Sequence, residues 1–205
     1  MVRKFTLGLM SLTLLSGCLS TPQPSNDEIA DACLMLKENR HWYKALRNSA
    51  KDWGAPMGYQ LAVIKQESNF DRKAKPAREK GFLFGLFPGK RPSTAYGYAQ
   101  ALDTTWDTYK RETRNGGADR HDFDDSVDFI GWYYANSGKI TGLSQYDYRG
   151  HYLAYHEGPN GYLRGSWRKK RWLVNTANKV SSNAQRYESQ IRNCKGLKRK
   201  FLGIF

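Results

Sequence analysis

The sequence predicts a mainly α-helical, single globular domain. The chain has 205 residues, of which 40% are hydrophobic, enough for one domain with a sizeable core. Near the C-terminus, apolar residues recur every three or four positions, as on one face of a helix, at Leu173, Ala177, Val180, Ala184, Tyr187, Ile191 and Cys194. No segment alternates like a convincing strand over more than a few residues, and no internal repeat is present.

The first helix is predicted from Ser25 to about Asp52. Ser25 and Glu28 have the spacing of a capping box, and Gly54 and Pro56 end the pattern. The second begins at Pro56, and its core-facing positions have helical spacing at Met57, Leu61, Ile64 and Ser68.

A third helix is predicted to be capped by Asp103 or Thr104 and stopped near Gly116. A fourth covers residues 124–136 and is closed by Gly138. The fifth ends at Gly158 and carries Tyr148, Tyr152 and Tyr155 at positions i, i+4 and i+7.

Residues 73–94 fit no helix and are predicted to form a long loop. Loops of this length are uncommon and are often lids or binding loops. The segment is rich in glycine and proline, and five large apolar residues interrupt it, namely Phe82, Leu83, Phe84, Leu86 and Phe87. These side chains must be buried on the domain, on a ligand or in a membrane.

The N-terminus has the pattern of a secretory signal. Arg3 and Lys4 precede a short apolar run over residues 5–15. The following Leu15-Ser16-Gly17-Cys18 resembles the bacterial lipobox, which implies removal of residues 1–17, lipidation of Cys18 and a tether over residues 18–26. Leu19 stands where an Asp would retain a lipoprotein in the inner membrane, so the resemblance implies an outer-membrane anchor facing the periplasm. An ordinary signal peptide with an incidental cysteine is the alternative.

Two cysteines remain in the mature chain. The periplasm is oxidising, so we expect a disulfide between Cys33 and Cys194, against the alternative of a free buried pair.

The formal net charge of +14 predicts attraction to an anionic polymer or surface. Nucleic acid would explain this charge but not the lipobox, so we expect no nucleic-acid partner. With 3 Cys and 4 His, and no His-Glu-x-x-His motif, we expect no metal site and no cofactor. The basic and apolar tail, residues 195–205, is predicted either to contact a membrane or to dock on the domain.

Glu67 is the candidate catalytic residue. It lies near the end of the second predicted helix, at the edge of the core-facing stripe, where loss of water and the helix C-terminus both raise the pKa of a carboxyl group. A Glu that stays protonated near neutral pH can act as a general acid in glycosidic cleavage.

Three motifs resemble, in order, those of the soluble lytic transglycosylase family. They are Glu67-Ser68, residues 95–100 (Ala-Tyr-Gly-Tyr-Ala-Gln) and residues 154–158 (Ala-Tyr-His-Glu-Gly). The resemblance implies a goose-lysozyme-like fold over residues 27–194 and cleavage of the MurNAc–GlcNAc bond of peptidoglycan, with no cofactor. We expect a monomer whose partners are the glycan strands and the membrane.

The resemblance also assigns roles to single residues. It makes Glu67 the only acid and base, and Ser68 a hydroxyl that contacts the sugar N-acetyl group or the acid. Gly97 would allow a close approach of the glycan, Gln100 would hydrogen-bond a sugar, and Tyr155 would orient Glu67. Tyr98 joins the expected substrate-binding residues, although it and Ala99 replace the usual Leu and Met. The aromatic residues that could hold sugar faces, or simply pack in the core, are Tyr96, Tyr98, Trp132, Tyr133, Tyr134 and Tyr152.

Two alternatives remain open. A hydrolytic muramidase on the same fold needs a base for water, and candidate carboxylates occur at Asp119, Asp122, Asp124, Asp125 and Asp128. Glu157, which with His156 replaces the usual Ala and Asn, is either an extra catalytic group or a solvated helix-terminal residue. A non-catalytic lipoprotein that only binds peptidoglycan is the second alternative.

Overall fold

The computed structural model describes residues 23–78 and 90–197. Within these ranges the chain is mainly helical and has no β-strand, which confirms the predicted fold class. The helices are α1 (Asn26–Ala30), α2 (Ala32–Glu38), α3 (Arg40–Trp53), α4 (Met57–Ser68), α5 (Asp103–Thr113), α6 (Phe123–Thr141), α7 (Tyr148–Glu157), α8 (Pro159–Leu163), the 3-10 helix η1 (Ser166–Lys169) and α9 (Arg171–Asn193). The signal segment with Cys18, the five large apolar residues of the long loop and residues 198–205 lie outside the described ranges.

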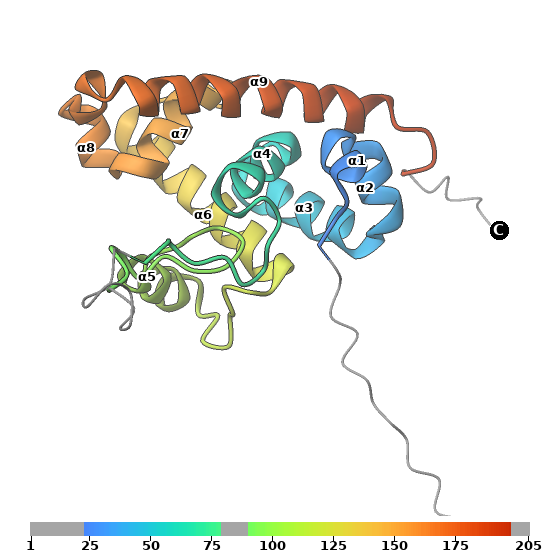
Figure 1. The fold of residues 1–205 in the computed structure, drawn as a ribbon, viewed down its shortest axis with the longest axis horizontal. Coiled ribbons are helices and arrows are strands. Elements are labelled where there is room, and N and C mark those ends of the chain that lie inside the picture. The colour runs from blue at the N-terminus through green and yellow to red at the C-terminus, as the bar shows by residue number, and fades with distance from the viewer. Residues whose placement is uncertain (1–22, 79–89, 198–205) are drawn as a thin grey trace, which may run out of the picture.

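The long helix α9 runs along one side of the molecule and covers α4 and α7 (Figure 1). Its predicted apolar stripe is confirmed, since Leu173, Ala177, Val180, Ala184, Tyr187 and Ile191 are all buried. Gly58 lets α4 approach α9 closely, because a Cβ there would lie 2.6 Å from the carbonyl oxygen of Ala184. At this close approach, the Gly58 N–H of α4 donates a hydrogen bond to the Glu188 carboxylate of α9.

Helix α4 is the centre of the domain. Every residue from Gly58 to Ile64 is buried, so the helix is enclosed on all sides rather than facing solvent along one face. Its last turn, where Glu67 lies, emerges from this enclosure. The fold thus presents the candidate acid at the end of a rigid central element.

The predicted single helix over residues 25–52 is wrong, because the segment forms three helices. Asp31 ends α1 and caps α2, its carboxylate accepting from the Cys33 and Leu34 N–H groups. Asn39 separates α2 from α3 with a non-helical backbone. Asp and Asn hydrogen-bond nearby backbone groups and so favour caps over helix interiors.

Two further boundaries differ from the prediction. Helix α5 starts after Leu102, and no side chain caps it. Asp103 instead forms an ion pair with Arg120 at 2.7 Å. Helix α6 continues through Gly138 and ends at Gly142, whose φ of 71° closes the helix. A glycine inside a helix is tolerated where packing supports it, and Gly138 lies against the buried ring of His151.

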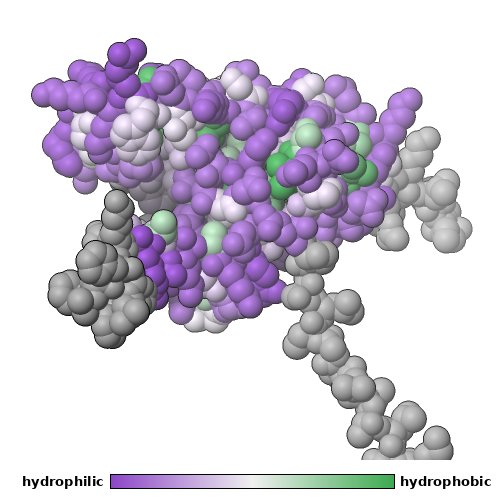
Figure 2. All heavy atoms as spheres, in the orientation of Figure 1, coloured by the Kyte–Doolittle hydropathy of each residue, from purple (hydrophilic) through white to green (hydrophobic). Residues whose placement is uncertain are grey.

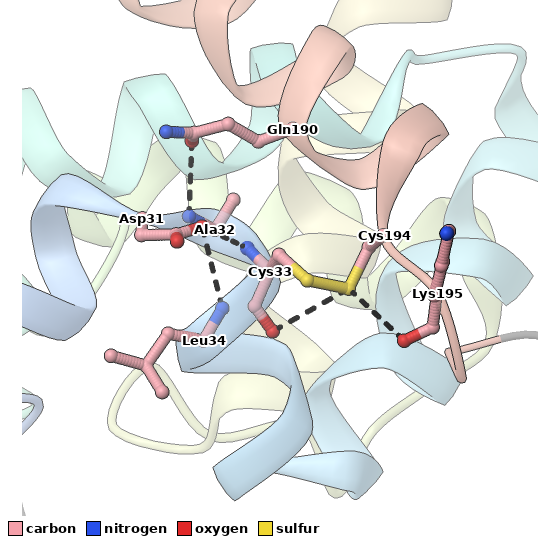
Figure 3. Close-up of a disulfide and its surroundings, with 7 residues drawn as sticks. All are labelled: Asp31, Ala32, Cys33, Leu34, Gln190, Cys194 and Lys195. Atoms are coloured by element: carbon pink, nitrogen blue, oxygen red, sulfur yellow. Dashed lines mark hydrogen bonds between the residues drawn. A yellow bond between two sulfur atoms is a disulfide. The ribbon is translucent and has the colours of Figure 1, made fainter.

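The predicted disulfide between Cys33 and Cys194 is confirmed, with the two Cα atoms 5.4 Å apart (Figure 3). It joins α2 to the residue that follows α9. Close to this disulfide, the Gln190 side chain of α9 accepts from the Ala32 N–H, so α2 is held to the end of α9 by both a covalent bond and a hydrogen bond.

Both ends of the described chain touch the domain. Gln23 of the expected tether donates to the Asn69 carbonyl at 2.7 Å, and Pro24 is buried. Leu197, in the first part of the expected tail, is 3% exposed. The face seen in Figure 2 is mostly hydrophilic, with small apolar patches. Among the described helices, none combines the length and the apolar character needed to cross a bilayer.

Candidate active site

Glu67 lies in the last turn of α4, two residues before Asn69, whose left-handed conformation ends the helix. The residue is partly accessible to solvent, yet protein surrounds its carboxyl group on most sides. Tyr152 of α7 donates a hydrogen bond to Glu67 Oε1 at 2.8 Å. One oxygen of this carboxyl group is therefore held in place, where the last turn of α4 emerges from the core.

Burial raises the pKa of Glu67 from 4.5 to about 7, and the hydrogen bond from Tyr152 limits the rise. Near neutral pH, the protonated and ionised forms are then both populated. A group that must first give and later accept a proton works best with a pKa close to the working pH.

Replacing Tyr152 with Phe should raise the pKa of Glu67 further, because the lost hydrogen bond favours the ionised form. Cleavage that starts with protonated Glu67 declines as the pH rises through this pKa, so its alkaline limb should move to higher pH. A pH profile of kcat/KM checks this. Tyr146→Phe is the matched control, since Tyr146 is 70% exposed and should leave the profile unchanged.

The expectation that Tyr155 hydrogen-bonds Glu67 is wrong. The Tyr155 hydroxyl donates to the carbonyl of Ala99 at 2.7 Å, and Tyr152 makes the bond to Glu67 instead. The two rings lie nearly parallel with centroids 6.4 Å apart, on adjacent turns of α7. One turn of the helix thus decides which hydroxyl reaches α4 and which supports the segment after the long loop.

That segment, residues 95–101, is a tight turn closed by a bridge between Tyr96 and Ala101. Gly97 has a φ of 74°, and a Cβ there would overlap the carbonyl of Arg120. Its N–H donates to Ala74 at 3.0 Å. The need for glycine is explained by this contact within the protein, while a close approach to a glycan stays a prediction.

Both amide N–H groups of the Gln100 side chain are used within the protein. Its Nε2 donates to the carbonyls of Ala74 and Gly97, both at 2.9 Å. Only the amide oxygen is left for a sugar, so the predicted hydrogen bond would have to be one that Gln100 accepts.

Tyr98 belongs to the core, which leaves little of its ring for the expected contact with substrate. It is 4% exposed and contacts Trp42 and Phe123 edge to face. Core packing also accounts for other aromatic candidates, since Trp132, Tyr134 and Tyr152 are buried. Tyr96 and Tyr133 remain partly accessible.

The Ser68 hydroxyl donates to the carbonyl of Ile64 at 3.0 Å, one turn back along α4. It makes no bond to Glu67. Its oxygen lone pairs can still accept an N–H, so contact with the sugar N-acetyl group stays a prediction.

Glu157 is not a solvated residue, and it is held as a carboxylate rather than as a proton-donating acid. Lys170 Nζ lies 2.7 and 2.9 Å from its two oxygens, and His156 and Ser166 also hydrogen-bond it. Burial opposes ionisation, but these hydrogen bonds outweigh it and lower the pKa of Glu157 to about 2. With 5% of its side chain exposed, this carboxylate joins the end of α7 to Lys170.

The aspartates of the muramidase alternative mostly serve the start of α6. Asp128 accepts from Trp53 Nε1 at 2.6 Å and from the Tyr109 hydroxyl at 2.7 Å. Asp122 caps α6, and Asp125 accepts from the Asp119 backbone. Within the described ranges, none of these aspartates contributes to the pKa shift of Glu67.

A pocket of about 280 Å³ brings Gln100 and Tyr155 together and extends to His156, Glu157 and Gly158. Glu67 does not line this pocket. The link between the two is helix α7, whose Tyr155 supports Ala99 and whose Tyr152, one turn earlier, holds Glu67. Within residues 23–78 and 90–197, no group of three or more His, Cys, Asp or Glu side chains is arranged to hold a metal ion.

The sequence did not indicate Tyr59 beside Glu67, nor the hydrogen bond from Tyr152 to Glu67. Tyr59 is 1% exposed, and the charge of Glu67 adds to burial in raising its pKa. It lies eight residues before Glu67, just over two turns of helix, and this spacing is the signal that could have indicated it.

A family model described as transglycosylase SLT domain matches residues 6–194. The chain belongs to this family. Membership assigns it to the lytic transglycosylases, which act on peptidoglycan, and agrees with the helical, lysozyme-like fold. Neither the curated proteins nor the solved structures include a significant match to the chain.

Proposed function

We propose that this transglycosylase SLT-domain protein is a lipid-anchored enzyme that cleaves the MurNAc–GlcNAc bond and leaves 1,6-anhydro-MurNAc. Glu67 is its single acid and base. The observation that carries the proposal is the burial of this carboxyl group beside the Tyr152 hydroxyl, with a pKa of about 7.

The reaction starts with protonated Glu67 giving its proton to the glycosidic oxygen. The bond from this oxygen to C1 of MurNAc breaks, and the acetamido oxygen stabilises the cationic C1. The Glu67 carboxylate then takes the proton from the C6 hydroxyl, whose oxygen bonds to C1. The ring closes without consuming water, and Glu67 returns to its protonated state.

A single carboxyl group suits this sequence better than hydrolysis. Glycosidases commonly use two carboxyl groups, one as acid and one as base or nucleophile. The described groups that shift the pKa of Glu67 include a tyrosine but no carboxylate. Both oxygens of Glu157 are already bound by Lys170, and His156 and Ser166 each bind one of them. This arrangement favours the C6 hydroxyl over water as the second proton donor.

Product masses from digested sacculi test the reaction. Muropeptides lighter than the reducing-end species by one water are expected from the wild type. Reducing ends would instead identify a muramidase. Binding to sacculi without any soluble product would identify the non-catalytic alternative.

The proposed anchor is a lipid on Cys18, with the domain in the periplasm at the outer membrane. Labelling with radioactive palmitate should mark the wild type and not Cys18→Ser, and only the wild type should fractionate with outer membranes. Thr21→Ala, in the expected tether outside the lipobox, is the control for a substitution as such. Palmitate on Cys18→Ser, or inner-membrane fractionation of the wild type, would contradict the assignment.

A further inference from the structure

A second pocket, of about 410 Å³, is lined by the start of the turn that holds Gln100. Its wall includes Lys75, Arg91, Tyr96, Asp103 and Arg120. Three cations, one carboxylate and one partly accessible aromatic ring thus line the same pocket. Neither the acid chemistry of Glu67 nor the pocket at Tyr155 uses these residues.

Two of the cations are available to a ligand. Lys75 lies with Nζ 5.1 Å from the centre of the Tyr96 ring, and Arg91 donates to the carbonyl of Pro76. Both are exposed, and neither forms an ion pair with a carboxylate in the part of the chain that the structure describes.

The third cation is structural. Arg120 pairs with Asp103 and donates to the carbonyls of Thr94 and Ala101 at 3.0 and 2.9 Å, which fixes both ends of the turn. The Asp103 side chain is still 53% exposed and engages Arg120 through one oxygen. Its other oxygen can accept from a ligand ammonium group.

The pocket is rigidly connected to the proposed acid. Ala74, next to Lys75, accepts from both Gly97 and Gln100. Between them in the same turn, Ala99 accepts from Tyr155 of α7, the helix whose Tyr152 holds Glu67. A ligand in this pocket would therefore be held by the same turn that borders the proposed glycan site.

We propose that this pocket binds the peptide stem attached to MurNAc, an inference that rests on the proposed function and names a second part of the same substrate. The stem carries several carboxylates and, when not cross-linked, a free ammonium group. Lys75 and Arg91 would bind the carboxylates, and Asp103 would bind the ammonium group. A stem branches from the strand beside the bond to be cut, which matches a pocket on the same turn as Gln100.

Direct binding tests the pocket without relying on catalysis. Full-length protein in detergent is titrated calorimetrically with an isolated stem tetrapeptide and with its fully amidated form. Binding of the acidic peptide only is expected. Lys75→Glu and Arg91→Glu should each weaken it about tenfold or more, the scale of losing a charge-assisted hydrogen bond. Lys179→Glu, an exposed change on α9, is the matched control.

Equal binding of the amidated peptide, or no effect of either charge reversal, would overturn the proposal. The proposal would also be overturned if the stem peptide did not bind while inorganic phosphate or phosphatidylglycerol vesicles did, with that binding lost in Lys75→Glu and Arg91→Glu. Circular dichroism melting checks that each variant is folded.

Digestion rates separate this inference from the proposed function. Strands that carry stems should be cut faster than strands stripped by an amidase, and Lys75→Glu should slow only the former. Equal rates on both strands would refute the stem pocket and leave the enzyme intact. Failure to cut either strand would refute the proposed function, and peptide titration would still decide what the pocket binds.

Discussion

Replacing Glu67 with Gln is expected to slow sacculus digestion by about 10²–10⁴-fold, the usual contribution of a general acid–base. The amide keeps the size of the side chain and can still accept from Tyr152, but it cannot transfer the proton. Release of soluble muropeptides measures the loss. Glu38→Gln, an exposed change at the end of α2, should leave the rate unaltered.

The same substitution should stabilise the fold at neutral pH. The pKa of Glu67 is about 7 in the folded protein and about 4.5 when unfolded, so the folded state binds more protons between these values. The stabilising effect of its protonated form is fully present below pH 4.5 and is lost as the pH rises through 7. At pH 8, the free energy of unfolding of Glu67→Gln should therefore exceed that of the wild type by up to about 3 kcal/mol.

Denaturant unfolding at pH 4 and pH 8 measures this difference, which should shrink at the lower pH. An inactive variant that is less stable than the wild type at pH 8 would indicate damage to the fold. Full activity of Glu67→Gln would overturn its assignment as the acid.

Removing the disulfide should have the other large effect. Cys33 and Cys194 are separated by 161 residues, and closing a loop of that size constrains the unfolded chain by about 5 kcal/mol in the chain-entropy account. Cys33→Ser combined with Cys194→Ser should lower the free energy of unfolding by this amount. Because a small domain has only about 5–15 kcal/mol in total, the double variant would be close to unfolding.

Urea unfolding with and without a reductant checks this prediction. Reductant should destabilise the wild type and leave the double variant unchanged. Because the disulfide joins α2 to the end of α9, on the far side of α4 from α7, folded molecules of both forms should cut glycan at similar rates. A wild type insensitive to reductant would contradict a stabilising disulfide.

Periodicity predicted the helices best where one face is apolar. The buried stripe on α9 was predicted because its apolar residues recur with the period of a helix, and the end of α7 was predicted from Gly158. The division of residues 25–52 was missed, because one Asp and one Asn interrupt the backbone without disturbing the apolar pattern.

The sequence by itself determined the helical class, the secretory and lipobox pattern, the cysteine pair and the position of Glu67. These are local patterns, or follow from the count of one residue type. Only the tertiary structure decided that Tyr152 rather than Tyr155 holds Glu67, that Tyr98 is core, and that Glu157 is paired with Lys170. The reason is physical: each of these contacts joins residues on different helices or loops. Which side chains meet depends on how segments far apart in the sequence pack against one another.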